Sequence, residues 1–550
     1  MSKVANNDHQ IADTGSQQLA DRPTLLATVC DLVLGVALCY LLTGGSVPDV
    51  NEAHYLAKAK HYWQTDWCQG DIFLESADTH LVFYWSLGWL TAWLPLTTTA
   101  WVLRIGIWAF LSWSMSRLVQ TVSPGLFRGA WAIGLFTLLM MNFHMAGEWV
   151  VGGAEAKGVA YGCVLLGLAS LCRGNWNRTW LLLGLASAFH VLVGGWSVIA
   201  GLVAWSFSGK ERIPIRKMLL GLLGGGAIAL LGLVPALNTT TATAEVTVAA
   251  NQIYVYERLP HHLAVHRIPP RFQLRLIILA CLSFAVAWPL REQRSVRRLA
   301  GFALGATLIA LAGLAIDQAL LRDLDRAASI LRFYWYRLAD FAIPLFAAML
   351  ILHWHQHLKL RYPKWATLLL VIAVWGPLTW WVSHRESRTA RQIPAADRQT
   401  LLHRMKDERY GEAQYHAWRS CCDWIGDHTP SDSLFMTPWT QQTFKLYAQR
   451  GEIANWKDIP QDANSIVEWN KRIRQLYPPN VRKSGLGQHS DARLTRLADR
   501  FGADYILIRR RTYSRRLDPG RFRRVYPNRT NSNPYFQVFQ VLTDGEIRDE

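Results

Sequence analysis

The chain lacks the short sequence motifs of several large enzyme classes. Its 550 residues contain no P-loop, no GxSxG and no dinucleotide-binding fingerprint, so nucleotide-driven transport and serine-hydrolase chemistry have no support. Its eight cysteines include no CxxC and no zinc-ligand spacing, and the sequence shows neither an internal repeat nor a long low-complexity segment. The distribution of apolar and charged residues is therefore the main signal.

Cysteine is too scarce to indicate a disulfide framework. Five cysteines lie in or beside apolar runs, where cysteine usually packs as a small hydrophobic residue: Cys30, Cys39, Cys163, Cys172 and Cys281. Cys68, Cys421 and Cys422 lie elsewhere, which leaves open one bridge from Cys68 to the adjacent pair.

Long apolar runs are absent from one part of the chain and dense in the other. Residues 383–550 are polar and contain no run of about 18 apolar residues, whereas residues 24–382 contain many. The first run, Leu25–Gly44, is longer than the core of a signal peptide and lacks a small-residue cleavage site, so we expect a retained span. The sequence predicts a cytoplasmic N-terminal tail (1–23), a transmembrane domain (24–382) and a soluble extracytoplasmic α/β domain (383–550).

Basic residues in five short connections set the orientation of the transmembrane domain. Lys and Arg stay on the cytoplasmic side, and all five connections lie there if the chain crosses about 11 times, with the N-terminus inside and the C-terminal domain outside. The predicted spans are roughly 24–43, 99–119, 129–147, 158–172, 179–193, 195–208, 216–237, 272–290, 299–320, 334–353 and 365–383. We therefore expect a polytopic α-helical protein of the cytoplasmic membrane.

One further apolar run, His80–Leu96, does not fit this orientation. Counting it as a span would place the basic connections outside, so we interpret it as a juxtamembrane or re-entrant helix whose Trp and Tyr favour the interface. It belongs to a large first external loop, residues 44–98. Acidic and aromatic residues thus collect on the external side, where a functional site is the simplest explanation.

The C-terminal domain has the pattern of an α/β fold. Ala503–Arg510 and Tyr535–Leu542 have the pattern of strands, whereas Asn464–Tyr477 and Asp491–Phe501 have helical spacing. The basic run Arg509–Arg524 is either a solvated loop or a surface that docks on anionic headgroups or an anionic glycan.

The chain is strongly basic. Its net charge is +18, and residues 383–550 hold 29 Lys and Arg against 20 Asp and Glu. In a protein anchored by many spans, this balance favours membrane lipids and lipid phosphates as partners, and we expect no nucleic acid.

A dense group of ionisable residues follows the first span. A helix that begins at Asn51 would place Asp49 and Glu52 at its N-terminal end, which favours carboxylates. The same helix would carry an aromatic stripe that seeks the membrane interface, made of Tyr55, Ala59, Tyr62 and Trp63. Two interpretations stay open: Asp49 or Asn51 caps the helix, or a carboxylate is held at the membrane surface as general base or metal ligand.

The order of these elements resembles the GT-C class of membrane glycosyltransferases. That class has an N-terminal span, an acidic first outer loop with juxtamembrane helices, a span with an early Arg and a second acidic loop. Its members use a sugar carried on a polyprenyl phosphate and have a catalytic carboxylate in the first loop. The resemblance implies that Glu52 and Tyr55 match the acidic motif of the class. Asn51 stands where the class has Asp, so Asp49 would act as the base in its place. Arg104, in "WVLRIG", matches the early Arg.

The second acidic loop, Gly147–Gly162, contains Glu155 and Lys157 among glycines that allow close backbone approach. One interpretation is an ordinary turn with a snorkelling Lys. The other, which the resemblance supports for Glu155, is a second carboxylate of the site beside a cation that binds phosphate.

A late span begins with the charged segment Leu331–Pro344. Arg337 and Asp340 are three residues apart and either neutralise each other or bind a ligand. Arg332 has no acidic residue one turn away and is the better candidate for a lipid phosphate, because an Arg fork matches phosphate oxygens. The segment also resembles the late span of the class that clamps the carrier phosphate.

Several histidines complete the candidate site. His190 lies in an apolar run beside a glycine pair, either as a packing element or as part of a site. His261, His262 and His266 have a spacing that could ligate a metal, so a divalent metal stays open while no cofactor is certain.

We therefore predict a glycosyltransferase of the cell envelope that transfers a sugar from a polyprenyl-phosphate donor to an unidentified glycan, lipid or protein on the external face. The predicted catalytic residues are Asp49, Glu52 and Glu155, and the predicted substrate-binding residues are Arg104, Lys157, His190, Arg332 and Arg337. Two alternatives stay open: a transporter with a midplane site near His190, or a catalytically silent relative that binds a lipid-linked glycan.

Overall fold

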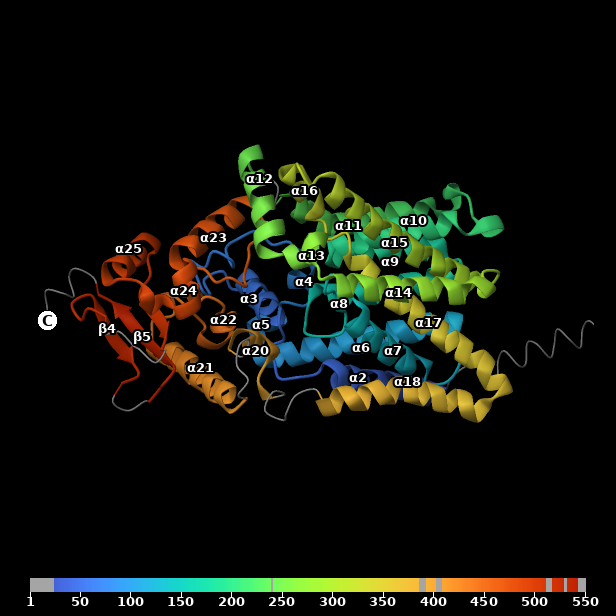
Figure 1. Cartoon of the computed structure of the whole chain (residues 1–550), viewed down its shortest axis with the longest axis horizontal. Coiled ribbons are helices and arrows are strands. Elements are labelled where there is room, and N and C mark those ends of the chain that lie inside the picture. Colours follow the sequence, from blue (N-terminus) through green and yellow to red (C-terminus); the bar gives the residue numbers. More distant parts are fainter. Residues whose placement is uncertain are drawn as a thin grey trace, which may run out of the picture.

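The computed structural model describes residues 24–238, 241–384, 392–401, 408–510, 517–528 and 532–542. The predicted tail 1–23 and the middle of the basic run Arg509–Arg524 lie outside the described residues. A bundle of long helices forms most of the molecule, and a smaller domain with a β-sheet lies at one end of it (Figure 1).

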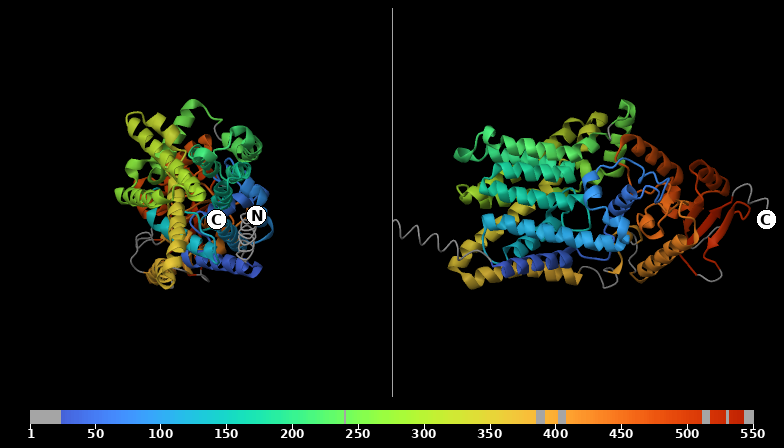
Figure 2. Two further views of the ribbon diagram at one scale, coloured as in Figure 1. Left: turned by 90° about the vertical axis from the view of Figure 1, so that its right-hand side faces the viewer. Right: turned by 180° about the vertical axis from the view of Figure 1, so that it is seen from behind.

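Helices form where the sequence has its apolar runs. The long ones are α2 (Leu25–Thr43), α6 (Leu96–Val122), α7 (Arg128–Phe143), α8 (Ala156–Arg173), α9 (Trp176–Phe189), α10 (Val191–Ser206), α11 (Leu219–Asn238), α14 (Pro270–Ala287), α15 (Arg294–Ala319), α17 (Arg337–Arg361) and α18 (Pro363–His384). Many of them run side by side along the long axis of the bundle (Figure 2).

Each predicted span overlaps one of these helices, but the number of crossings stays a prediction. In the part of the chain that the structure describes, seven helices are long and apolar enough to cross a membrane. α7, α9 and α10 have 16, 14 and 16 residues, which is short for a hydrocarbon core of about 30 Å. The structure therefore supports a multi-pass membrane protein without fixing eleven crossings.

The first loop, between α2 and α6, folds into three short helices, α3 (Glu52–Trp63), α4 (Leu81–Ser86) and α5 (Leu90–Trp93). The run His80–Leu96 is thus broken into helices too short to span, as predicted. The prediction that the stripe of α3 faces the membrane interface is wrong for Tyr55, which is buried with its ring 5.8 Å from that of Phe83. The stripe instead packs α3 against the other two helices.

The segment between α11 and α14 covers the junction of bundle and sheet domain. It contains α12 (Ala244–Gln252), the π-helix η3 (Ile253–Arg258), α13 (Pro260–Leu263) and η4 (Val265–Arg267), and α16 (Leu324–Leu331) packs beside it. α12 contacts α23 (Ala463–Leu476) of the sheet domain (Figure 1). Shorter 3-10 turns, η1 (Gly209–Glu211), η2 (Ile215–Met218) and η5 (Trp288–Leu290), connect the spans at other places.

The sheet domain is α/β, as predicted. Its helices are α20 (Ala395–Leu401), α21 (Glu408–His428), α22 (Phe444–Ala448), α23 (Ala463–Leu476), α24 (Pro479–Ser484), η6 (Leu486–Gln488) and α25 (Asp491–Phe501), and its strands are β1 (Leu434–Met436), β2 (Gly451–Glu452), β3 (Tyr505–Arg509), β4 (Phe522–Tyr526) and β5 (Phe536–Val541). The strand order is β2-β1-β3-β5-β4. β1 pairs in parallel with β2 and β3, whereas β5 is antiparallel to β3 and β4.

A buried ion cluster joins the sheet domain to the first loop. Lys445 Nζ lies 3.2 Å from Asp71 Oδ2, 2.5 Å from Glu452 Oε1 and 2.7 Å from Asp458 Oδ2. Each of these side chains is at most 2% exposed. Because a buried charge is stable only when it is paired, the loop and the domain depend on each other.

All eight cysteines are free, so the bridge from Cys68 to Cys421 or Cys422 is wrong. Cys68 packs with Ala57 and Phe73 in a small cluster of the first loop. Cys421 and Cys422 belong to a different hydrophobic cluster, which keeps the thiols apart.

Candidate functional site

Glycines in the second loop let it pack directly on the first. Residues 144–155 connect α7 and α8. A Cβ on Gly153 would lie 2.8 Å from Asp49 Cβ and 3.1 Å from Glu52 Cβ, so only glycine fits there. The Ala154 N–H donates to Glu52 Oε1 at 2.8 Å. The predicted acidic residues of the two loops are therefore neighbours in space.

Glu52 is fully buried, and both of its carboxylate oxygens are used within the protein. Arg104 donates to Oε1 from Nε at 3.2 Å and to Oε2 from Nη2. The Asp49 N–H also donates to Oε2, at 2.8 Å. Burial raises the pKa of Glu52, and the charge of Arg104 opposes this shift. Glu52 and Arg104 thus fix the start of α3 against α6.

Asn51 stands at the point where the resemblance implies a carboxylate. It is the N-cap residue of α3, but its side chain makes no capping bond, so that interpretation is wrong for Asn51. Instead its Nδ2 donates to Glu155 Oε2 at 3.5 Å. Asp49 lies beside it, and its Oδ1 accepts from the Val50 N–H at 2.8 Å. Asn51 therefore connects the two acidic loops.

Glu155 and Lys157 form an ion pair at the start of α8. Lys157 Nζ lies 3.4 Å from Glu155 Oε2 and 3.7 Å from Glu148 Oε1, and 3.5 Å from the centre of the Trp149 ring. The Trp149 indole donates to Glu155 Oε1 at 3.1 Å. Burial raises the pKa of Glu155, while Lys157 opposes the shift. Because Lys157 is 5% exposed, the interpretation as a snorkelling Lys is wrong.

Arg337 joins this group from the first turn of α17. Its Nε lies 2.8 Å from Glu148 Oε2, and its Nη1 lies 3.3 Å from His190 Nε2. Asp340 does not neutralise Arg337, contrary to one interpretation of the sequence. Its carboxylate instead accepts from three backbone N–H groups between α7 and α8, those of Met145, Ala146 and Glu148, at 2.6, 2.8 and 3.2 Å. Asp340 therefore anchors the loop, and Glu148 is the partner of Arg337.

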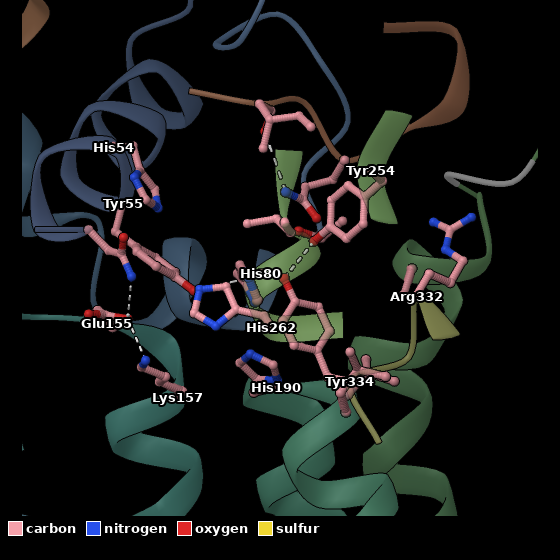
Figure 3. A pocket seen from close by; sticks show the side chains of 18 of the residues that line it. His54, Tyr55, His80, Glu155, Lys157, His190, Tyr254, His262, Arg332 and Tyr334 are labelled. Carbon is pink, nitrogen blue, oxygen red and sulfur yellow. Dashed lines mark hydrogen bonds and ion pairs between the residues drawn. The ribbon is translucent and has the colours of Figure 1, made fainter. Parts of the chain in front are cut away.

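A row of four aromatic rings runs beside these charges, made of His54, Tyr55, His80 and His190 (Figure 3). Successive ring centres are 5.1, 5.2 and 5.0 Å apart. The Tyr55 hydroxyl lies 3.2 Å from His80 Nε2. Burial lowers the pKa of His54 to about 3 and that of His80 to about 4, so both imidazoles are neutral near pH 7.

These groups line a cavity of about 560 Å³, which is the size of a small-molecule site. Figure 3 shows Glu155 and Lys157 on one side, Arg332 on the other and His80, His190 and His262 between them. Arg332 Nη1 donates to Asn251 Oδ1 at 2.6 Å. No carboxylate among the described residues pairs with Arg332. The sheet domain contributes Lys457 and Asp458 to the lining.

The structure brings five of the eight predicted site residues to this cavity: Glu155, Lys157, His190, Arg332 and Arg337. Asp49, Glu52 and Arg104 are not part of its lining. These three residues lie outside the cavity, on the far side of the residues that line it. There Glu52 and Arg104 form an ion pair, and Asp49 packs on Gly152 and Gly153. Their catalytic and binding roles therefore stay predictions.

Several residues that line the cavity are not among the predicted site residues, chiefly His54, His80, Tyr254, Tyr334, Lys457 and Asp458. His54 could have been found, because it lies on the polar side of the predicted helix between Glu52 and Tyr55. Lys457 and Asp458 follow no local pattern, since their position depends on how the sheet domain packs on the first loop.

The three histidines with metal-ligand spacing do not converge on one point: the rings of His261 and His262 lie 4.0 Å apart, but His262 and His266 have different partners. His262 Nδ1 lies 2.5 Å from the Ala146 carbonyl oxygen, and His266 Nδ1 lies 3.5 Å from Asp317 Oδ2. Among the residues that the structure describes, no group of three or more His, Cys, Asp or Glu side chains is arranged to hold a metal ion.

Comparison with known proteins gives a family match for a short segment. A family model described as "Domain of unknown function (DUF6798)" matches residues 416–476, which include α22, β2 and α23. No curated protein matches the chain by sequence.

Two solved structures are similar over most of the chain. One is the archaeal oligosaccharyltransferase AglB from Archaeoglobus fulgidus in complex with an inhibitory peptide and a dolichol-phosphate, at 10% identity and a TM-score of 0.45, covering 87% of this chain and 69% of that one. The other is the oligosaccharyltransferase of the same organism in complex with Zn and sulfate, at 11% identity and a TM-score of 0.33, covering 88% and 67%. Similarity at this level does not establish a shared activity.

Proposed function

We propose that the protein is a membrane glycosyltransferase that transfers a sugar from a polyprenyl-phosphate-linked donor to an acceptor. The observation that carries the proposal is the presence of Glu155, Lys157, Arg337 and Arg332 around one cavity at the end of the helical bundle. Cationic side chains around one cavity can bind a phosphate through charge-assisted hydrogen bonds. A carboxylate among them can stabilise the positive charge that develops at an anomeric carbon during sugar transfer.

Charge balance within the cavity favours an anionic ligand. Glu148 and Glu155 offset Lys157 and Arg337, so these four side chains sum to zero. Arg332 adds a positive charge, because its partner Asn251 is neutral. Arg258 and Lys457 line the same cavity and add cationic groups. A phosphate would therefore find an excess of positive charge and several N–H donors.

One wall of the cavity is apolar and gives access for a lipid chain. It is formed by α11, which contributes Leu233, Ala236 and Leu237. Leu233 and Leu237 remain 37% and 56% exposed, on a helix that is a candidate membrane span. An isoprenoid chain could lie along α11 in the bilayer while its phosphate enters the cavity, without exposing the chain to water.

In this proposal Lys157 and Arg337 stabilise the leaving phosphate, and Arg332 binds it from the opposite wall. Glu155 faces the sugar and stabilises the positive charge that develops at the anomeric carbon. His190 holds the Arg337 guanidinium. Asp49, Glu52 and Arg104 keep the two acidic loops together behind the wall.

The experiment measures two properties of the protein in lipid nanodiscs. The first is the affinity for polyprenyl phosphate. The second is release of polyprenyl phosphate from a panel of radiolabelled polyprenyl-phosphate hexoses and pentoses, with membrane extract as the source of acceptor. Arg332→Gln and Lys157→Gln should each weaken binding at least about tenfold, since hydrogen bonds to charged groups contribute about 1.5–3 kcal/mol.

Arg322→Gln is the matched control, because Arg322 is exposed and does not line the cavity. Wild-type affinity in both cavity variants would contradict the proposal. Uptake of a solute into proteoliposomes without any covalent product would favour the transporter. Binding without release from any member of the panel would favour the silent relative.

A further inference from the structure

Two buried polar atoms face each other at the boundary between the first loop and the sheet domain. His54 Nδ1 lies 4.0 Å from Asp458 Oδ1. Both atoms are buried, and neither has a hydrogen-bond partner among the residues that the structure describes. Leaving a buried polar atom without a hydrogen bond costs the folded protein about 1–3 kcal/mol. Two such atoms that face each other therefore indicate a hydrogen bond between His54 and Asp458 that forms in another state of the site.

Asp458 is held with one oxygen aimed at the imidazole. Its Oδ2 accepts from Lys445 Nζ at 2.7 Å and from Asn455 Nδ2 at 2.9 Å. Its own N–H donates to Asn455 Oδ1 at 3.0 Å. Burial raises the pKa of Asp458, but Lys445 and His54 lower it more, so the group is a carboxylate at neutral pH. Oδ1 is left for His54.

His54 is the group of this pair that reaches the cavity. Its side chain is 23% exposed and lines the cavity, whereas its Nδ1 is buried on the side of Asp458. The ring also packs edge-on against Phe73, with centres 6.0 Å apart, which limits its rotation. Nε2 is therefore the ring nitrogen that a ligand can approach.

We propose that His54 accepts the proton of a hydroxyl acceptor and that Asp458 is its positioning residue, an inference that rests on the proposed function. The acceptor oxygen attacks the anomeric carbon, and the bond from that carbon to the phosphate oxygen breaks with its electron pair. The hydroxyl proton passes to His54 Nε2. Asp458 receives the hydrogen bond of Nδ1–H and stabilises the imidazolium, and polyprenyl phosphate leaves from Lys157 and Arg337.

The carboxylates near the cavity are less suited to this step. Glu52 is fully paired, and Asp49 does not line the cavity. Glu155 accepts from Asn51 and Trp149 and pairs with Lys157, so its oxygens are already used. His54 instead combines an accessible nitrogen with a carboxylate behind the other nitrogen, and the distance of 4.0 Å must shorten when substrate binds.

The charges around His54 determine how basic it is. Burial lowers its pKa, Asp458 raises it, and Lys457, Arg258 and His80 lower it further. Lys457 comes from the sheet domain, Arg258 from η3 and His80 from the segment before α4. A bound anionic phosphate opposes the effect of the two cations, so His54 becomes a stronger base when the donor is present.

The test uses His54→Gln in the nanodisc assays described above. Turnover should fall at least about 100-fold, the range of a lost general base, while affinity for polyprenyl phosphate stays within twofold of wild type. His61→Gln is the matched control on the same helix, because His61 does not line the cavity and should keep wild-type turnover.

Asp458→Asn distinguishes a positioning role from a structural one. Removing its charge makes His54 a weaker base, so the acidic limb of the pH–rate profile should move to lower pH and turnover should fall about tenfold. A variant that lost only stability would keep the wild-type profile, and that result would overturn the role of Asp458.

The outcomes separate the two proposals. Wild-type turnover in His54→Gln overturns this inference and leaves the proposed function intact, whereas absence of both binding and release in the wild-type protein overturns the proposed function.

Carbethoxylation by diethyl pyrocarbonate, mapped by mass spectrometry, tests His54 without turnover. We expect His54 to be modified and to be protected by polyprenyl phosphate, and resistance of the free protein would overturn the inference.

Discussion

The charged residues of the site fall into two kinds: those fully paired inside the protein and those that also face the cavity. Glu52 and Arg104 are buried at 0% and 2% exposure and use their hydrogen-bonding groups on each other and on backbone. Glu155 and Lys157 are nearly as buried but line a cavity. A substitution at the first pair should therefore act on folding, and one at the second pair on ligand binding and transfer.

Glu52→Gln should destabilise the protein by about 3–5 kcal/mol, because it leaves the Arg104 charge buried without a partner. Thermal unfolding in detergent measures this change. The double variant Glu52→Gln with Arg104→Met removes the unpaired charge and should recover part of the loss. If Glu52→Gln unfolded like wild type and lost only sugar transfer, Glu52 would be a catalytic residue and not a structural one.

Lys457 should make donor binding depend on pH. Burial and the neighbouring Arg258 lower the pKa of Lys457 to about 8. A bound phosphate favours the protonated ammonium, so binding takes up a proton once the pH exceeds the pKa of the free protein. Affinity for polyprenyl phosphate should therefore fall above pH 8, by at most about tenfold per pH unit.

Binding titrations from pH 7 to pH 10 test this dependence. Lys457→Gln removes the titrating group and should give weaker binding that is flat over the same range. An unchanged slope in Lys457→Gln would assign the pH dependence to another group.

At the level of elements, the π-helix η3 closes one side of the cavity, and a few polar contacts hold it on the sheet domain. Arg258, at the end of η3, donates from Nε to the Trp456 carbonyl oxygen at 2.9 Å and from Nη2 to that of Lys457 at 3.1 Å. Arg474 of α23 pairs with Glu257 of the same π-helix at 2.7 Å. These contacts hold η3 on the sheet domain and keep that side of the cavity in place.

Arg258→Ala should loosen this segment. Two hydrogen bonds to a charged donor are lost, so amide hydrogen exchange over residues 253–267 should accelerate at least about tenfold. Arg267→Ala is the control, because Arg267 is exposed in the same segment. Equal exchange in wild type and Arg258→Ala would mean that apolar packing alone holds η3.

The elements were easier to predict than the contacts between them. Apolar runs and strand patterns are local, so helices lie over every predicted span and β3 and β5 lie within the predicted strands. The choice of partner for a charge is not local. Arg337 prefers Glu148 to Asp340, which is closer in sequence, because Asp340 is used by the backbone of the second loop.

The candidate site was predictable where one loop carries it and not where several meet. Glu155 and Lys157 lie two residues apart, and their pairing follows from glycines and charge in one segment. His54 and Asp458 meet because the first loop packs on the sheet domain, where Asp71 pairs with Lys445 and Trp67 donates to Gln449. No sequence pattern near Asp458 indicates that contact.

For the whole molecule, Lys445 is one link between the bundle and the sheet domain, beside the contacts of Arg258 and Arg474. Lys445→Met would leave Asp71, Glu452 and Asp458 buried without a cation, which should cost at least about 3–5 kcal/mol and separate the unfolding of the domain from that of the bundle. Asp71→Asn should cost less, because Lys445 keeps two carboxylates. Calorimetry checks both, and one unchanged transition in Lys445→Met would contradict the role of this cluster.

Lys457 and Asp458 line the cavity but are synthesised late, so the cavity is completed only near the end of translation. The bundle and both acidic loops leave the ribosome before these residues are made, and at about 5–20 residues per second the delay is on the order of ten seconds. During that time Lys157, Arg332 and Arg337 lack the cover that the sheet domain later gives them. Under the proposed function, a nascent chain would meet lipid phosphates before the sheet domain completes the cavity that processes them.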